Sequence, residues 1–149
     1  MKRINAYKKL FAVESTTNLK SLKTKYRNLV KEWHPDKFQE DNPLAKEAEV
    51  KSQEIIDAYH FLVSMASETI EAEKETYVKE TLESGVSDFK HKGQVLEVTF
   101  FDGNTYEYFG VKPPLYQKLI NSDKQNRFLK RSIALEFPYR KSKTGQLQD

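Results

Sequence analysis

The chain has 149 residues, enough for one ordinary domain or two small ones. It contains no Cys and only three separated His residues, which excludes a disulfide framework, thiol catalysis and a thiolate zinc site. Charged residues make up 32% of the chain, but nine Phe, eight Tyr and one Trp are too many aromatic residues for a disordered protein.

The net charge of +3 conceals three blocks of opposite sign. Residues 1–37 carry +7, residues 46–83 carry −6 and residues 112–149 carry +6. No apolar run approaches the roughly 18 residues that span a bilayer, and Met1–Asn5 is not followed by an apolar stretch that would indicate a secretory leader. We therefore expect a cytoplasmic protein that does not associate with membranes, with partners that recognise its charged blocks.

The first half of the chain is predicted to be helical. It contains no Gly before Gly85, and residues 45–83 contain neither Gly nor Pro. A short helix is expected over Ala6–Phe11, a second over Leu19–Trp33, and a third from Asn42-Pro43, where a capping residue precedes Pro at the first helical position. The acidic residues 67–83 are expected to form a helical extension or a separate helix that leads to a second domain.

The predicted helix Leu19–Trp33 has two faces. Thr16, Thr17 or Asn18 can cap its start, and Pro35 disfavours helical geometry in the residue before it, so the helix must end by Trp33-His34. The apolar stripe comprises Leu19, Leu22, Tyr26, Leu29, Val30 and Trp33. The basic stripe beside it comprises Lys20, Lys23, Arg27 and Lys31.

The loop after this helix carries the tripeptide His34-Pro35-Asp36, between Tyr26-Arg27 upstream and Asp57-Ala58-Tyr59 in the next helix. Together with the opening Asn5–Val13, these residues resemble the J-domain of DnaJ-like co-chaperones over residues 4–66. The resemblance implies docking on a DnaK-type heat-shock chaperone and stimulation of its ATP hydrolysis. It assigns the contact to Lys23, Tyr26, Arg27, Lys31, His34, Pro35, Asp36 and Lys37. Taken singly, the basic stripe is also typical of a solvated helix face, and His34 of a loop residue bonded to the backbone.

The second half is predicted to be a small α+β domain. Val95–Phe101 alternates apolar and polar residues, Asp102-Gly103-Asn104 is a hairpin turn signal, and Thr105–Val111 returns with Tyr106 and Tyr108 on one face. A further strand over residues 87–91 and helices over residues 113–121 and 124–133 complete the prediction. The expected fold is an antiparallel helical hairpin followed by a three-stranded antiparallel sheet with two helices.

Residues 86–141 resemble the KTSC domain, a module found at the C-terminus of some lysyl-tRNA synthetases. The resemblance rests on Leu96–Phe100, Tyr106–Phe109, Arg127-Phe128 and Phe137–Arg140. Because the module occurs together with tRNA synthetase domains, the resemblance suggests RNA binding. The candidate nucleic-acid-binding residues are Tyr106, Tyr108, Arg127, Lys130, Arg131, Tyr139 and Arg140. Two alternatives remain open: the tyrosines pack in the core, or the domain binds a client peptide.

The predicted organisation is a J-domain-like region over residues 1–66, an acidic extension or linker over 67–85, a KTSC-like domain over 86–141 and a mobile tail over 142–149. We expect no catalytic residue, metal or cofactor, because no nucleophile, carboxylate pair or phosphate loop has a suitable setting. The predicted function is that of a co-chaperone whose C-terminal domain targets it to a client or a nucleic acid. The alternative is an RNA-binding module with a degenerate J-domain.

Overall fold

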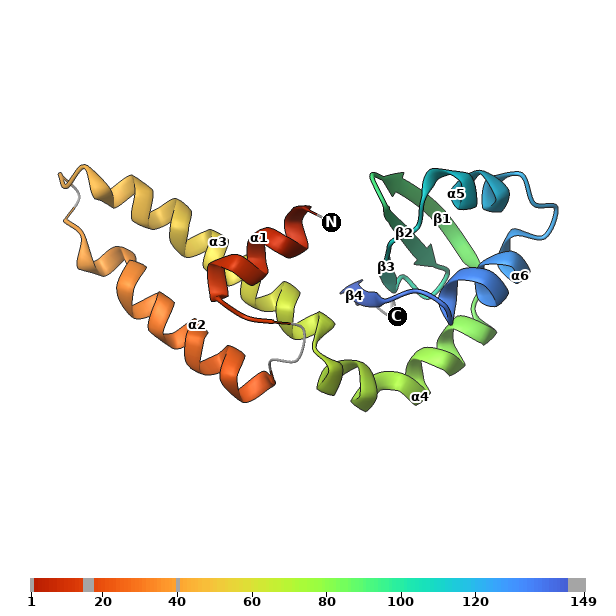
Figure 1. Ribbon diagram of the computed structural model, residues 1–149, viewed down its shortest axis with the longest axis horizontal. Coiled ribbons are helices and arrows are strands. Elements are labelled where there is room, and N and C mark those ends of the chain that lie inside the picture. The colour runs from red at the N-terminus through yellow and green to blue at the C-terminus, as the bar shows by residue number, and fades with distance from the viewer. Residues whose placement is uncertain (1, 15–17, 40, 145–149) are drawn as a thin grey trace. The chain divides into compact units, whose positions relative to one another are not determined.

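The computed structural model describes residues 2–14, 18–39 and 41–144, which form two compact units, Lys2–Thr69 and residues 70–144 (Figure 1). Thr16 and Thr17, two of the three predicted caps, lie outside the described residues. The third, Asn18, has an extended backbone, and its Oδ1 accepts a hydrogen bond from the Ser21 amide at 2.8 Å. Asn18 is therefore the N-cap of the second helix.

The N-terminal unit contains three helices and one short turn. They are α1 (Lys2–Phe11), α2 (Leu19–Trp33), η1 (Pro35–Lys37) and α3 (Leu44–Met65), and Figure 1 shows α2 and α3 running side by side as an antiparallel pair. The first helix begins four residues earlier than predicted, and its additional turn includes the buried Ile4. The buried core comprises Phe11, Leu22, Ile55, Ala58, Leu62 and Ala66.

A separate helix, α4 (Ser67–Glu83), follows α3 after a break at Ala66. Ala66 has an extended backbone with ψ of 140°, which ends α3 and allows the new helix to start. The carboxylate of Glu68 accepts a hydrogen bond from the Leu19 amide at 2.9 Å and so adds a second cap to α2. From Ile70 onward α4 belongs to the C-terminal unit, where Tyr77 and Thr81 are buried. The predicted acidic extension therefore carries part of the core of that unit.

The C-terminal unit is built on an antiparallel sheet of four strands in the order β1-β2-β3-β4. The strands are β1 (Val86–Lys92), β2 (Val95–Phe100), β3 (Thr105–Phe109) and β4 (Tyr139–Lys143). The predicted alternation is confirmed for β2, whereas every residue of β3 is buried. Gly103 has the positive φ of 86° that the connecting turn requires. The prediction of three strands missed β4, which pairs with β3 through Tyr108↔Tyr139 and Glu107↔Arg140.

Strand β4 includes Ser142 and Lys143, where the sequence predicted the start of a mobile tail. The Ser142 hydroxyl donates to the Thr105 carbonyl at 3.2 Å, so β4 is held to β3 by a side chain as well as by backbone pairing. Residues 145–149, the last five of the predicted tail, lie outside the described residues.

The core of this unit lies between the sheet and the helices. Helix α5 (Pro113–Ile120) and helix α6 (Gln125–Leu129), with the π-helical segment η2 (Lys130–Ala134) that continues it, occupy the two predicted helical positions. The buried residues are Tyr77, Leu96, Val98, Phe100, Tyr106, Tyr108, Val111, Leu119, Leu129, Ile133 and Ala134.

Candidate functional site

The His34-Pro35-Asp36 loop is a tight turn between α2 and α3. His34 has an extended backbone with φ of −60° and ψ of 131°, the geometry that a following Pro favours, so α2 ends at Trp33. Pro35 then starts η1, in which the Lys37 amide donates to the His34 carbonyl and the Phe38 amide to the Pro35 carbonyl, both at 3.0 Å. The turn thus has its own hydrogen bonds.

The His34 imidazole stabilises this turn from within. Its Nδ1 accepts a hydrogen bond from the Asp36 amide at 3.2 Å, which requires that Nδ1 carry no proton and assigns the proton of the neutral ring to Nε2. The same Nδ1 lies 3.6 Å from Oδ2 of Asp36. The Asp36 side chain is nevertheless 91% exposed. The turn therefore presents a carboxylate to solvent on a fixed backbone.

The cations assigned to the same surface are all exposed. Lys23, Arg27 and Lys31 follow one another at intervals of four along α2, so they share one face of the helix. Lys37 adds a further exposed cation within η1. The basic stripe therefore runs along one face of α2, and the loop that carries Asp36 and Lys37 follows directly after the end of this helix at Trp33.

Tyr26 has a different setting from the cations around it. Its ring stacks on Tyr59 of α3, with centroids 4.1 Å apart and planes 13° from parallel, and it is half-buried. Tyr26 therefore helps hold α2 against α3, and only its outer part is available to a partner.

Two of the tyrosines proposed for nucleic-acid binding are core residues. Tyr106 and Tyr108 are buried, so neither ring face is free to stack with a base, and the core alternative describes them correctly. Tyr139 is half-buried and stacks on Tyr77 of α4, with ring centroids 3.8 Å apart. Burial raises the pKa of the phenols of Tyr77, Tyr106, Tyr108 and Tyr139 above the ordinary value.

Arg140 is also occupied within the fold. Its guanidinium forms an ion pair with the carboxylate of Glu107 on the adjacent strand, and both side chains are largely buried. The guanidinium therefore neutralises the buried Glu107 carboxylate and links the two strands, so Arg140 is not available to bind a phosphate. The remaining candidates lie on α6 and η2, where Arg127 and Arg131 are exposed and Lys130 is half-buried.

The setting of three further residues was not predicted. Tyr77 falls on a weak continuation of the apolar face of α3, a signal too faint to assign it to the second core. Glu68 caps α2 across 49 positions in sequence, which no local pattern reveals. Phe101 follows β2 in the alternating pattern, on the face that carries Glu97 and Thr99. That position is the sequence signal for its exposure, and its side chain is 74% exposed.

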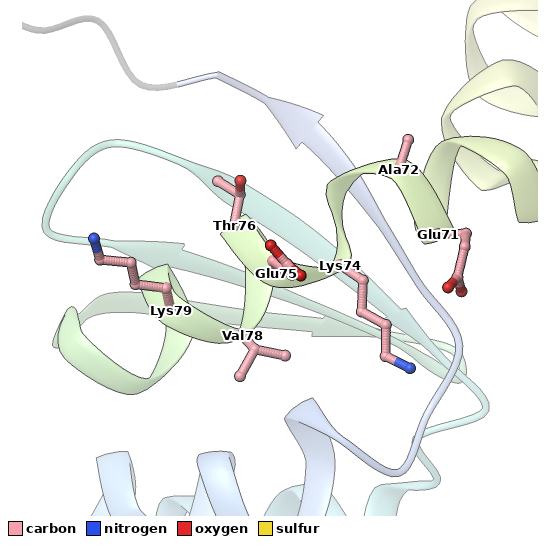
Figure 2. Close-up of a pocket in the computed structure, with 7 residues that line it drawn as sticks. All are labelled: Glu71, Ala72, Lys74, Glu75, Thr76, Val78 and Lys79. Carbon is pink, nitrogen blue, oxygen red and sulfur yellow. The ribbon is translucent and has the colours of Figure 1, made fainter.

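An open hollow of about 830 Å³ lies along α4 (Figure 2). Its charged side chains alternate in sign, and none of the residues predicted for either binding surface lines it. Within the described ranges, no group of His, Asp and Glu side chains is arranged to hold a metal ion, and no helix has the length and apolar character needed to cross a bilayer. The lining residues are Glu71, Ala72, Lys74, Glu75, Thr76, Val78 and Lys79.

Comparison with known families agrees with both motif-based resemblances. Residues 5–69 match the family model of the DnaJ domain, and residues 85–137 match the family model of the KTSC domain. The two resemblances are therefore confirmed, as is the order of the domains along the chain. No curated protein matches the sequence significantly.

Proposed function

We propose that this chain, which joins a DnaJ domain to a KTSC domain, docks on a DnaK-type chaperone and stimulates its ATP hydrolysis. The DnaJ domain is a co-chaperone module, and that general role is the starting point. The observation that supports the finer proposal is the exposed Asp36 carboxylate, held outward on a turn that the His34 ring stabilises. Such a carboxylate can reach a basic group on the chaperone without a change in the loop.

The exposed cations of α2 supply the attraction that brings the partners together. Lys23, Arg27 and Lys31 form a positive face that complements an acidic surface on the chaperone. Exposed ion pairs contribute only about 0–1 kcal/mol each, so a few of them give fast association and modest affinity that falls with ionic strength. Weak binding suits a co-chaperone that must dissociate after hydrolysis has been triggered.

Single-turnover ATP hydrolysis by the DnaK-type chaperone of the same organism tests the proposal. The parent protein should accelerate hydrolysis, and the His34→Gln and Asp36→Asn variants should lose the acceleration while keeping the helical circular-dichroism signal. Lys118→Gln, which changes an exposed cation of α5, is the matched control and should behave as the parent. Acceleration that survives Asp36→Asn would contradict the assigned role of the loop.

The C-terminal unit, in this proposal, selects where the stimulation takes place. The exposed cations of α6 and η2, Arg127 and Arg131, support an anionic target such as a nucleic acid or an acidic client. Because DnaJ-like proteins are commonly cytoplasmic, we place the protein there as part of the same proposal. If the parent did not stimulate a DnaK-type chaperone but bound RNA, the alternative of an RNA-binding module with a degenerate J-domain would replace it.

A further inference from the structure

The end of α4 and the turn between β2 and β3 expose apolar side chains in one unit. Leu82, in the last turn of α4, is 50% exposed, and Phe101, in the turn, is 74% exposed. Single exposed apolar residues are common, but apolar side chains gathered at one place indicate a contact site.

Gly85 and Asn126 join these segments into one surface. A Cβ on Gly85 would lie 2.9 Å from the Phe101 ring and 3.6 Å from Nδ2 of Asn126, so ring and amide flank the same point. The Phe101 amide donates to the Gly85 carbonyl at 2.9 Å, and the Val86 amide donates to Oδ1 of Asn126 at 3.2 Å. These contacts hold the Phe101 ring beside the first residues of α6.

The neighbouring helix supplies a group of cations, which Asp123 and Glu136 flank in the sequence. Residues 124–135 contain four Lys or Arg and no Asp or Glu. Nζ of Lys130 donates to the Leu82 carbonyl at 2.6 Å, which places η2 against the end of α4, and Figure 1 shows α6 beside this end of the helix. Arg127 and Arg131, four positions apart, are both exposed. We refer to Leu82, Phe101, Asn126, Arg127, Lys130 and Arg131 as the Phe101 surface.

The carboxylates nearest to the turn are engaged in hydrogen bonds of their own. Asp102 accepts from the backbone amide and the side-chain amide of Asn104 at 2.9 and 3.1 Å. Glu80 accepts from the same side-chain amide at 3.0 Å. These bonds orient the two carboxylates toward Asn104, while Arg127 and Arg131 of α6 and η2 are exposed.

We propose that the Phe101 surface binds single-stranded RNA, with one base stacked on Phe101 and adjacent phosphates held by Arg127 and Arg131. An exposed planar ring accepts any base, and the four cations of residues 124–135 favour a polyanion. An acidic peptide would share the attraction for the cations, but it would not require a flat aromatic face. The proposal rests on the targeting role proposed above for the C-terminal unit, and it replaces the buried Tyr106 and Tyr108 as stacking residues.

Stacking on Phe101 can be separated from the charge of the surface by titration. The full chain is titrated into a labelled single-stranded RNA of about 15 nucleotides, and Kd is measured by fluorescence anisotropy over a range of salt concentrations. Phe101→Ala should weaken binding by about five- to hundredfold, the effect of losing one stacked base, without changing the salt slope. Phe101→Trp should retain binding. Leu135→Ala, which truncates another exposed apolar side chain of the unit, is the matched control and should bind as the parent.

The phosphate contacts predict a different signature. Arg127→Gln should lower the slope of log Kd against log salt by about 0.7, the value for one phosphate of a single strand. Lys118→Gln removes an exposed cation from α5 and should leave the slope unchanged. A loss of affinity on Phe101→Ala with an unchanged slope, together with a lower slope on Arg127→Gln, supports the proposal.

Three results would overturn it. The first is the absence of RNA binding by the parent at low salt, about 50 mM. The second is equal affinity for a duplex of the same length, in which the bases are not accessible. The third is a Glu-rich peptide that binds as tightly with the same dependence on Phe101. Thermal melts verify that each variant is folded, and Phe101→Ala should still stimulate the chaperone, so failure of RNA binding is distinguishable from failure of the co-chaperone role.

Discussion

The hydroxyl of Tyr77 in α4 lies 2.9 Å from the hydroxyl of Tyr108 in β3, inside the core of the C-terminal unit. Tyr77 also donates its only hydroxyl proton to the Ala134 carbonyl at 2.6 Å, so Tyr108 must be the donor in the pair. The Tyr77 hydroxyl thus accepts a hydrogen bond from Tyr108 in β3 and donates one to the carbonyl of Ala134 in η2. This arrangement makes α4 part of the core and leads to the first three predictions.

Tyr77→Phe should destabilise the C-terminal unit. The substitution keeps the ring and its stacking on Tyr139, but it leaves the Tyr108 hydroxyl and the Ala134 carbonyl without their partner. Leaving a buried polar group unsatisfied costs about 1–3 kcal/mol, which urea unfolding measures. Tyr116→Phe, in a half-buried ring that stacks on His91, is the control and should have a smaller effect. Equal effects of the two substitutions would contradict the role assigned to Tyr77.

A fragment of residues 86–149 should fold poorly, whereas residues 67–149 should fold cooperatively. The shorter fragment lacks α4 and therefore exposes the rings of Tyr106, Tyr108 and Tyr139 that contact Tyr77. The dispersion of amide resonances in proton–nitrogen NMR spectra distinguishes the two outcomes. A well-dispersed spectrum of the shorter fragment would show that the sheet and its own two helices suffice.

The buried tyrosines predict a loss of stability in alkali. Burial raises the folded-state pKa of Tyr77, Tyr106 and Tyr108 above the unfolded value of about 10. Above that value the unfolded chain releases phenolic protons that the folded unit retains, so the unfolded state binds fewer protons and the free energy of unfolding decreases as pH rises. Below about pH 10 the contribution is fully present. Phenolate absorbance should therefore rise together with the loss of sheet signal in circular dichroism. A smooth titration of all tyrosines near their ordinary pKa, without unfolding, would argue against it.

Arg140→Met should destabilise the sheet more than the double substitution with Glu107→Leu. Removing one partner of a buried ion pair costs about 3–5 kcal/mol, because the attraction within the pair no longer offsets the burial of the remaining charge. Replacing both partners by apolar side chains removes that charge and should restore much of the stability. Chemical denaturation of the two single variants and the double variant gives the coupling free energy. Additive effects would indicate that the two side chains act independently.

Arg27→Gln should weaken chaperone binding and reduce its dependence on salt. Arg27 is exposed on the basic face of α2, and in the proposed complex we expect it to contribute to electrostatic steering more than to a fixed contact. Binding kinetics measured at several salt concentrations should show a lower association rate at low salt and little change in dissociation. An exposed cation of the other unit, changed in Lys118→Gln, is the control. An effect confined to the dissociation rate would indicate a close contact at Arg27 instead.

The parts of the structure that local chemistry determines were predictable. The period of the apolar residues in α2, the position of Pro35 and the turn at Gly103 each depend on residues within a few positions of one another. Strand β4 was not predictable in this way, because it forms by pairing with β3 more than 30 positions earlier in the chain. Its residues Tyr139–Lys143 are mostly polar and lack the alternation that identified β2.

The candidate binding residues follow the same division. The exposed loop of Asp36 could be inferred from its motif and its place between two helices. The burial of Tyr106 and Tyr108 could not be inferred, because the alternation of apolar and polar residues indicates only that the two side chains share a face. Whether that face is covered depends on Tyr77 in α4. The acidic composition of residues 67–83 gives little indication that this helix contributes a core residue. Nor does the sequence reveal that Arg140 pairs with Glu107 on the neighbouring strand, so it predicts an exposed cation there.

The stretch that matches the KTSC family, residues 85–137, stops short of both segments that close the core around its central tyrosines. Tyr77 precedes it and Tyr139 follows it, yet the two rings stack on each other beside Tyr108. A protein that acquires this module by gene fusion must therefore also acquire the flanking helix and the last strand, or supply equivalent elements from its own sequence. The same sheet attached to other neighbours would then expose a different surface, and one small module could acquire different partners in different proteins.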